Sequence, residues 1–191
     1  MSKLNIGINF GGVLSFYKNK SDNTRNNIGF FKNLEDSFDL NWNAVTILRK
    51  LHNDGHNLYL ITCCDKKDKK INTKIRNLID DNIPDLFKEI HFVKKKEHIN
   101  DVCLYLGCNV MIDSKFNPLV NISNYNRNML LLLITDDPKF DYELLSIVGR
   151  YWKKRNIYKV KNWIAVYNIC SNTSHYNKLI YHNKFIDLKH L

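Results

Sequence analysis

The chain has 191 residues, of which 44% are hydrophobic and 25% charged, and its formal net charge at pH 7 is +10. This composition is typical of one folded domain and excludes a collagen-like or wholly disordered chain. The longest apolar run, 129–134, is far shorter than the roughly 20 residues that a membrane-spanning helix needs, and the first ten residues lack the layout of a signal peptide. We therefore expect a soluble, cytoplasmic protein with no membrane partner.

The cysteine and lysine contents bear on the redox state of the protein, on its partners and on its source. Five cysteines, with Cys63 and Cys64 adjacent, predict reduced thiols rather than a disulfide framework. The positive charge favours an anionic partner. The chain is also rich in Asn, Lys and Ile, whose codons are AT-rich, so an AT-biased genome, such as that of many large DNA viruses, accounts for part of the lysine content. For a viral protein the expected location is the host-cell cytoplasm or the virion.

Short apolar runs alternate with segments of helical spacing along the chain. The first run ends in a loop at Phe10-Gly11-Gly12. In chain order the pattern predicts a strand at 4–8, a helix from 43 to the glycine at 55, a strand at 57–62, a helix at 71–79, a strand at 90–93, a helix at 99–106 closed by Gly107, strands at 110–113 and 129–135, a helix at 141–153, a strand at 157–160 and a helix from 162.

This alternation predicts the fold class. Strands separated by helices require a parallel sheet with both faces covered, which is a doubly wound α/β domain with ligands near the carboxyl ends of its strands. We expect the domain to span 1–170, with 15–39 as a small insertion in place of a large cap domain, and 171–191 as a C-terminal appendage.

Polar residues stand at the ends of the predicted strands. The first strand ends in Asn9-Phe10-Gly11-Gly12 and the second in Thr62, while Lys94-Lys95-Lys96 opens the helix at 97–107 and Asp113-Ser114 ends the fourth strand. This order resembles the four motifs of the haloacid dehalogenase-like (HAD) superfamily, from about residue 4 to about residue 170. Residues 51–62 are similar to the small nucleotidase branch of that superfamily. The resemblance implies a Rossmann-like sheet with a phosphatase site.

Two motif positions depart from the family pattern. Asn9 stands where the family has its nucleophilic aspartate, and Gly11 stands where it has its acid/base aspartate. An amide is a negligible nucleophile and glycine cannot donate a proton, so no catalytic residue is intact. The resemblance implies Mg²⁺ held by Asp113 and the Gly11 carbonyl, and with a single carboxylate this site would bind Mg²⁺ weakly.

The anion-binding half of the motif set is retained. The resemblance assigns phosphate binding to the Thr62 hydroxyl, to one lysine, for which we favour Lys95, and to the backbone N–H groups of the loop, which could hold a phosphate without a carboxylate. The loop donors are those of Phe10, Gly11 and Gly12.

Three functions follow from these residues. The first is a catalytically degenerate HAD-like protein, a pseudo-phosphatase that binds a phosphorylated small molecule or a protein partner, or serves as a scaffold. The second is a phosphatase or nucleotidase for a small phosphomonoester, with an altered mechanism in which Asp113 positions water. The third is nucleic-acid binding through a basic stretch with aromatic neighbours, whose candidate residues are Arg150, Lys153, Lys154 and Arg155.

Overall fold

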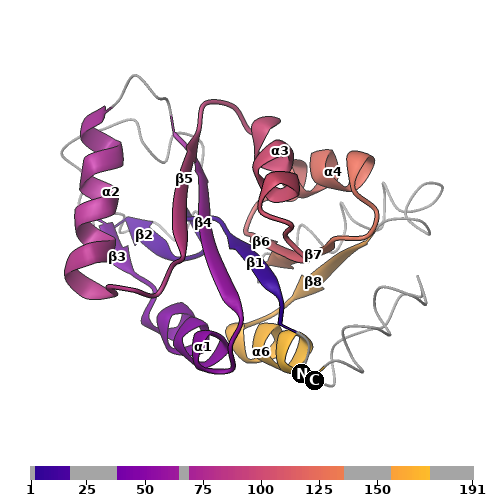
Figure 1. Ribbon diagram of the computed structural model, residues 1–191, viewed down its shortest axis with the longest axis horizontal. Coiled ribbons are helices and arrows are strands. Elements are labelled where there is room, and N and C mark those ends of the chain that lie inside the picture. The colour runs from indigo at the N-terminus through magenta and orange to yellow at the C-terminus, as the bar shows by residue number, and fades with distance from the viewer. Residues whose placement is uncertain (1–2, 18–37, 65–68, 136–155, 173–191) are drawn as a thin grey trace.

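The computed structural model describes residues 3–17, 38–64, 69–135 and 156–172 (Figure 1). Its elements are β1 (Asn5–Ile8), β2 (Ser15–Tyr17), β3 (Phe38–Leu40), α1 (Trp42–Asn53), β4 (Asn57–Cys63), α2 (Lys69–Asn82), β5 (Glu89–Val93), α3 (His98–Tyr105), β6 (Val110–Asp113), α4 (Phe116–Tyr125), β7 (Leu130–Ile134), β8 (Ile157–Val160) and α6 (Trp163–Ser171).

The main sheet has six strands in the order β5-β4-β1-β6-β7-β8. Every neighbouring pair in it is parallel. The strand order reverses direction at β1, since the chain moves from β1 outward through β4 to β5 and then returns to the other side of β1 at β6. This is the doubly wound α/β sheet that the alternation of strands and helices predicts, and it makes β1 an interior strand.

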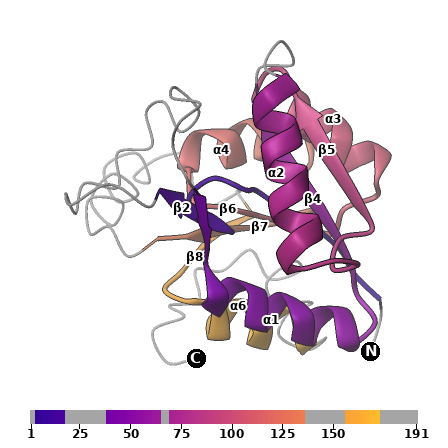
Figure 2. The ribbon, with the colours of Figure 1, turned by 90° about the vertical axis from the view of Figure 1, so that its left-hand side faces the viewer.

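Helices cover both faces of the sheet (Figure 2). On one face α1, α2 and α6 pack on strand residues such as Ile6 and Ile8, and on the other face α3 and α4 pack on residues such as Met111 and Leu131. Gly7 lies between the two isoleucines and belongs to the second face. A Cβ at Gly7 would lie 2.8 Å from the Met111 sulfur, so the second face has no room for a side chain at this position of β1.

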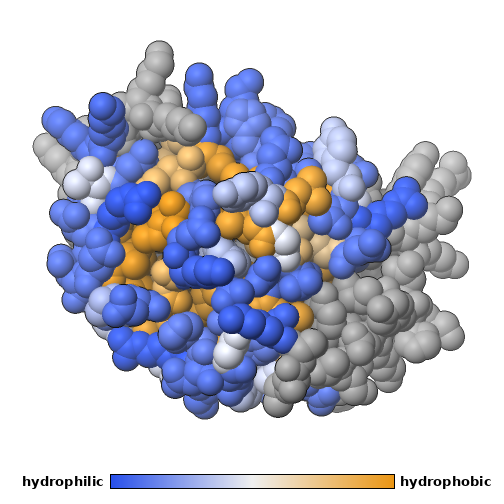
Figure 3. Space-filling view, in the orientation of Figure 1, coloured by the Kyte–Doolittle hydropathy of each residue, from blue (hydrophilic) through white to orange (hydrophobic). Residues whose placement is uncertain are grey.

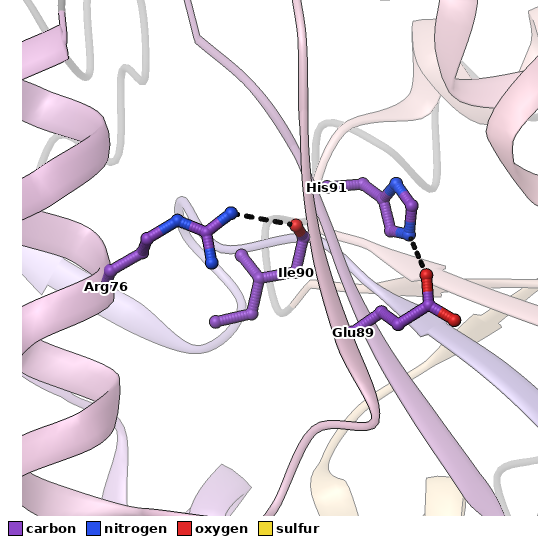
Figure 4. Close-up of polar contacts among 4 residues, drawn as sticks. All are labelled: Arg76, Glu89, Ile90 and His91. Carbon is purple, nitrogen blue, oxygen red and sulfur yellow. Dashed lines mark hydrogen bonds and ion pairs between the residues drawn. The ribbon is translucent and has the colours of Figure 1, made fainter.

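The edge strand β5 is tied to α2. Arg76 of α2 donates a hydrogen bond to the Ile90 carbonyl oxygen at 3.3 Å (Figure 4). Its guanidinium also lies 5.0 Å from the centroid of the Phe92 ring. His91 Nε2 lies 2.9 Å from Glu89 Oε2 on the same strand. Figure 3 shows apolar surface in the region of β5 between hydrophilic side chains. These contacts place polar and charged groups along an edge that would otherwise expose backbone.

Most of the expected elements are confirmed, and two features were missed. The sequence pattern did not predict α4, because Pro118 and several asparagines weigh against a helix; the proline lies in the first turn, where its missing N–H costs no helical hydrogen bond. It also did not predict the antiparallel pair β2–β3, which brackets the insertion. The helix expected at 141–153 lies outside the described residues, and the division of the chain at residue 170 stays a prediction.

Two expectations about composition can be compared with the structure. No disulfide joins the five cysteines, of which four are buried and Cys63 is half-buried; their reduced state stays a prediction. Within the described ranges, no helix combines the length and the apolar character needed to cross a bilayer.

Candidate functional site

The strand register brings the polar strand ends to one edge of the sheet. Ile8 of β1 pairs with Leu60 of β4 and with Ile112 of β6. Asn9, the next residue, therefore lies beside Asp113, and its backbone N–H donates to the Ile112 carbonyl oxygen at 3.0 Å. The same register places Thr62 near the loop that follows β1, at the carboxyl edge where doubly wound folds bind ligands.

The Asn9 side chain joins this loop to β6. Its Nδ2 donates to Asp113 Oδ1 at 3.1 Å and makes a longer contact of 3.4 Å with the Gly11 carbonyl oxygen. The amide orientation follows from these two acceptors, because a flipped amide would set its oxygen against two other oxygens. The amide nitrogen thus lies between a carboxylate and a backbone carbonyl.

Asp113 is a buried carboxylate with several donors around it. Its side chain is 1% exposed, and Oδ1 also accepts a hydrogen bond from the Lys115 backbone N–H at 2.9 Å. Burial raises the pKa of the Asp113 carboxyl from 3.8 to about 6, although the Lys115 N–H, the Asn9 amide and the Lys115 charge act in the opposite direction. The carboxyl is therefore mainly ionised at pH 7 and is stabilised by N–H groups within the site.

These residues do not fit a resident Mg²⁺. The Gly11 carbonyl oxygen accepts from the Ser114 hydroxyl at 3.3 Å as well as from Asn9, so both of its lone pairs are engaged. Mg²⁺ requires an octahedron of oxygens at about 2.0–2.1 Å and favours more than one carboxylate. Across the part of the chain that the structure describes, no three His, Cys, Asp or Glu side chains lie close enough together to hold a metal ion.

The loop after β1 is closed on itself. The N–H groups of Val13, Leu14 and Ser15 all lie within hydrogen-bonding range of the Phe10 carbonyl oxygen, at 3.4, 3.0 and 3.0 Å. Gly12 has a φ of +76°, which suits glycine, and its N–H donates to the Ser15 carbonyl oxygen at 2.9 Å. Of the predicted phosphate donors, the Gly12 N–H would have to give up this bond before it could reach a ligand.

The other predicted phosphate residues differ in their exposure. Thr62 is 1% exposed, and its hydroxyl lies 4.0 Å from the Cys64 sulfur. Lys95 is exposed in the segment after β5, and its carbonyl oxygen accepts from the His98 N–H at 3.1 Å. The roles of Thr62 and Lys95 in phosphate binding stay predictions.

Two lysines lie close enough to interact at this edge. Lys115 is half-buried; its pKa is lowered first by burial and then by the charge of Lys96. Both lysines also act on the half-buried Cys63, whose pKa burial raises and their charges lower. The charge of Lys96, the residue after Lys95, therefore acts on Cys63 and Lys115 at this edge. The sequence analysis missed Lys115, because it belongs to no motif. Its position directly after Asp113-Ser114 could have indicated that it lies near the site.

The predicted nucleic-acid residues cannot be placed at this edge or elsewhere. Arg150, Lys153, Lys154 and Arg155 lie outside the described residues.

Comparison with known proteins supports the fold. Neither a scan of protein-family models nor a search of curated proteins finds a match. Among solved structures, a HAD-superfamily hydrolase from Ehrlichia chaffeensis is similar to this chain, with a TM-score of 0.54 and 13% sequence identity over 90% of this chain and 98% of that one. At this identity the likeness concerns the fold, and it agrees with the strand order and the helical layers described above. The chain therefore has the α/β fold of the HAD-like hydrolases.

Proposed function

We propose that this protein binds a phosphorylated ligand at the carboxyl edge of its sheet and does not hydrolyse it. The observation that carries the proposal is the contact between Asn9 and Asp113, at 3.1 Å. In the HAD motif this position carries a nucleophilic carboxylate. Here it carries the Asn9 amide, whose nitrogen donates a hydrogen bond to the Asp113 carboxylate. Formation of an acyl phosphate needs a carboxylate oxygen that is free to attack phosphorus.

The absence of a proton donor at Gly11 supports the same conclusion. In the motif this position carries the acid that protonates the leaving group, and glycine has no side chain to do so. Catalytic residues act together, so the loss of one removes most of the rate enhancement. With both residues replaced, the other motif residues can accelerate the reaction very little.

The positive charges of Lys96 and Lys115 support an anionic ligand. Lys115 is half-buried, and burial and the charge of Lys96 lower its pKa while Asp113 raises it. An anion bound between the two lysines would oppose both of the lowering effects, because it attracts each ammonium group. A phosphate group is the anion that the motif resemblance implies, carried by a small molecule or by a protein partner.

One observation favours a second candidate, a phosphatase with an altered mechanism. The pKa of Asp113 is raised to about 6, close to the range in which a carboxylate serves as a general base. Such a base could activate water in place of the missing nucleophile. Its 1% exposure weighs against this role, because water and the phosphorus atom would both have to reach it.

Phosphate release separates the two candidates. We expect native protein to release no phosphate from p-nitrophenyl phosphate above the blank, either in excess Mg²⁺ or in EDTA. The Asp113→Asn variant, purified in the same way, is the matched control. Turnover in the native protein that disappears in this variant would contradict the proposal and establish the second candidate.

A further inference from the structure

The Asn9 amide nitrogen contacts two oxygens at the carboxyl edge of the sheet. It lies 3.1 Å from Asp113 Oδ1 and 3.4 Å from the Gly11 carbonyl oxygen, the same two oxygens to which the HAD resemblance assigns Mg²⁺. We infer that the Asn9 side-chain amide substitutes for the divalent cation at the centre of this fold and joins β1 to β6 without a metal. This inference concerns the centre itself and does not depend on which ligand the protein binds.

Hydrogen-bond donors stabilise the ionised Asp113 carboxylate in place of a cation. An amide carries no net charge, so it cannot neutralise the buried carboxylate alone. The Lys115 N–H donates at 2.9 Å, and further support comes from the Ser114 N–H and the Lys115 charge, each of which lowers the Asp113 pKa. A buried carboxylate that accepts several N–H bonds can stay ionised without a counterion in contact.

The dimensions of the centre suit an amide better than a metal. Hydrogen bonds to nitrogen run at about 2.7–3.2 Å, so the 3.1 Å contact with Asp113 lies within this range and the 3.4 Å contact with Gly11 slightly beyond it. Mg²⁺–oxygen distances are much shorter, at about 2.0–2.1 Å. To bind Mg²⁺ at the place of the nitrogen, both oxygens would have to approach by roughly 1 Å. Gly11 is bridged to Ser15, and its carbonyl oxygen also accepts from Ser114, so in the native protein these contacts and the Asn9 amide oppose closure onto a cation.

Asn9→Asp should therefore make the stability of the protein depend on a divalent cation. The substitution replaces an N–H donor by a carboxylate of nearly the same shape, so that two carboxylates and a carbonyl converge. Without a cation these groups repel, and stability falls. With a divalent cation they form an oxygen ligand set, and binding to the native state alone restores stability.

The experiment is thermal unfolding of the full chain in EDTA and in excess MgCl₂. We expect the unfolding midpoint of the native protein to be the same in both buffers. The midpoint of Asn9→Asp should fall by several degrees in EDTA and recover in MgCl₂. Asn9→Ala loses the donor but gains no carboxylate, so its midpoint should fall without recovery.

Asn5→Asp is the matched control from the other end of β1. Asn5 Nδ2 donates to the Leu106 and Gly107 carbonyl oxygens at 2.9 and 3.2 Å, and no carboxylate is among its bonded partners in the described residues. The same substitution should destabilise the protein here without rescue by Mg²⁺. This control separates a specific centre from a general effect of Mg²⁺ on added negative charge.

Three results would overturn the inference. The first is stabilisation of the native protein by Mg²⁺ to the extent seen for Asn9→Asp, and the second is an Asn9→Asp midpoint that does not respond to Mg²⁺. If Asn9→Asp does not fold in EDTA, refolding in MgCl₂ supports the inference, whereas failure in both buffers, with Asn9→Ala folded, is the third. None of these readouts involves phosphate, so the proposed function can fail while the inference stands, and the reverse.

Discussion

The Asp113 carboxylate accepts a hydrogen bond at 2.9 Å from the backbone N–H of Lys115, two residues further along the chain. This contact closes a short turn of the kind that Asp commonly makes, and it sets the path from β6 into α4. The same oxygen accepts from Asn9 at 3.1 Å. The buried Asp113 carboxylate therefore connects β1, β6 and the start of α4.

The raised pKa of Asp113 predicts an unusual pH dependence of stability. Because the folded-state pKa is about 6 and the ordinary value is 3.8, the native state binds the proton more tightly than the unfolded state between these values. Ionised Asp113 thus costs stability above pH 6, and that cost is relieved as the pH falls through 6. Between pH 7 and pH 5 the native protein should gain about 1 kcal/mol relative to Asp113→Asn, as measured by urea unfolding. An equal pH response of the two proteins would contradict this.

The helix caps at Asn41 and Asn162 predict different responses to the same substitution. Each side chain accepts from a backbone N–H in the first turn of its helix, α1 or α6. Asn41 also donates to the Val13 carbonyl oxygen at 3.2 Å, and aspartate cannot make that bond. Asn41→Asp should therefore cost about 1 kcal/mol, whereas Asn162→Asp should be neutral or slightly stabilising.

Chemical unfolding of the two variants checks this prediction. Asn162→Ala is the reference for loss of a cap and should cost about 1 kcal/mol. Equal destabilisation by Asn41→Asp and Asn162→Asp would show that the contact with Val13 contributes nothing.

Cys63 should be the first cysteine to react with iodoacetamide in the folded protein. It is half-buried, whereas the other four thiols are buried. Burial raises its pKa while Lys96 and Lys115 lower it, so its reaction should be slow at neutral pH and accelerate as the pH rises. Lys115→Gln removes one of the two cations and should slow the reaction at a fixed pH. Peptide mass spectrometry would refute the prediction if a buried thiol reacted first.

Much of the fold could be predicted from the sequence because its signals are local. The strand at 57–62 is a continuous apolar run, and the helix before it ends at a glycine; the structure gives β4 as Asn57–Cys63, and Gly55 has a φ of +90°. Helix α4 lacked such a signal. Its apolar residues are interrupted by Pro118 and several asparagines, and it forms because Leu119 and Ile122 are buried against the sheet, which is a tertiary effect.

The site could be located from the sequence but not described. Strand ends predict which residues share an edge, so Asn9, Thr62 and Asp113 could be placed together. The sequence could not show that the Asn9 amide would bond to Asp113, since that depends on the register of β1 against β6. Lys115 was missed for a similar reason, because its approach to Lys96 depends on the neighbouring positions of α3 and α4 in space.

The central claim is that this site binds phosphate without a metal and without hydrolysis. Calorimetric titration of inorganic phosphate into the protein in EDTA tests it most directly, with Lys96→Gln and Lys115→Gln as site variants. Lys88→Gln is the control, since Lys88 is an exposed lysine just before β5, at the opposite end of the sheet. We predict binding by the native protein and by Lys88→Gln, weakened at least severalfold in both site variants. Absence of binding in EDTA, or equal weakening in Lys88→Gln, would contradict the account.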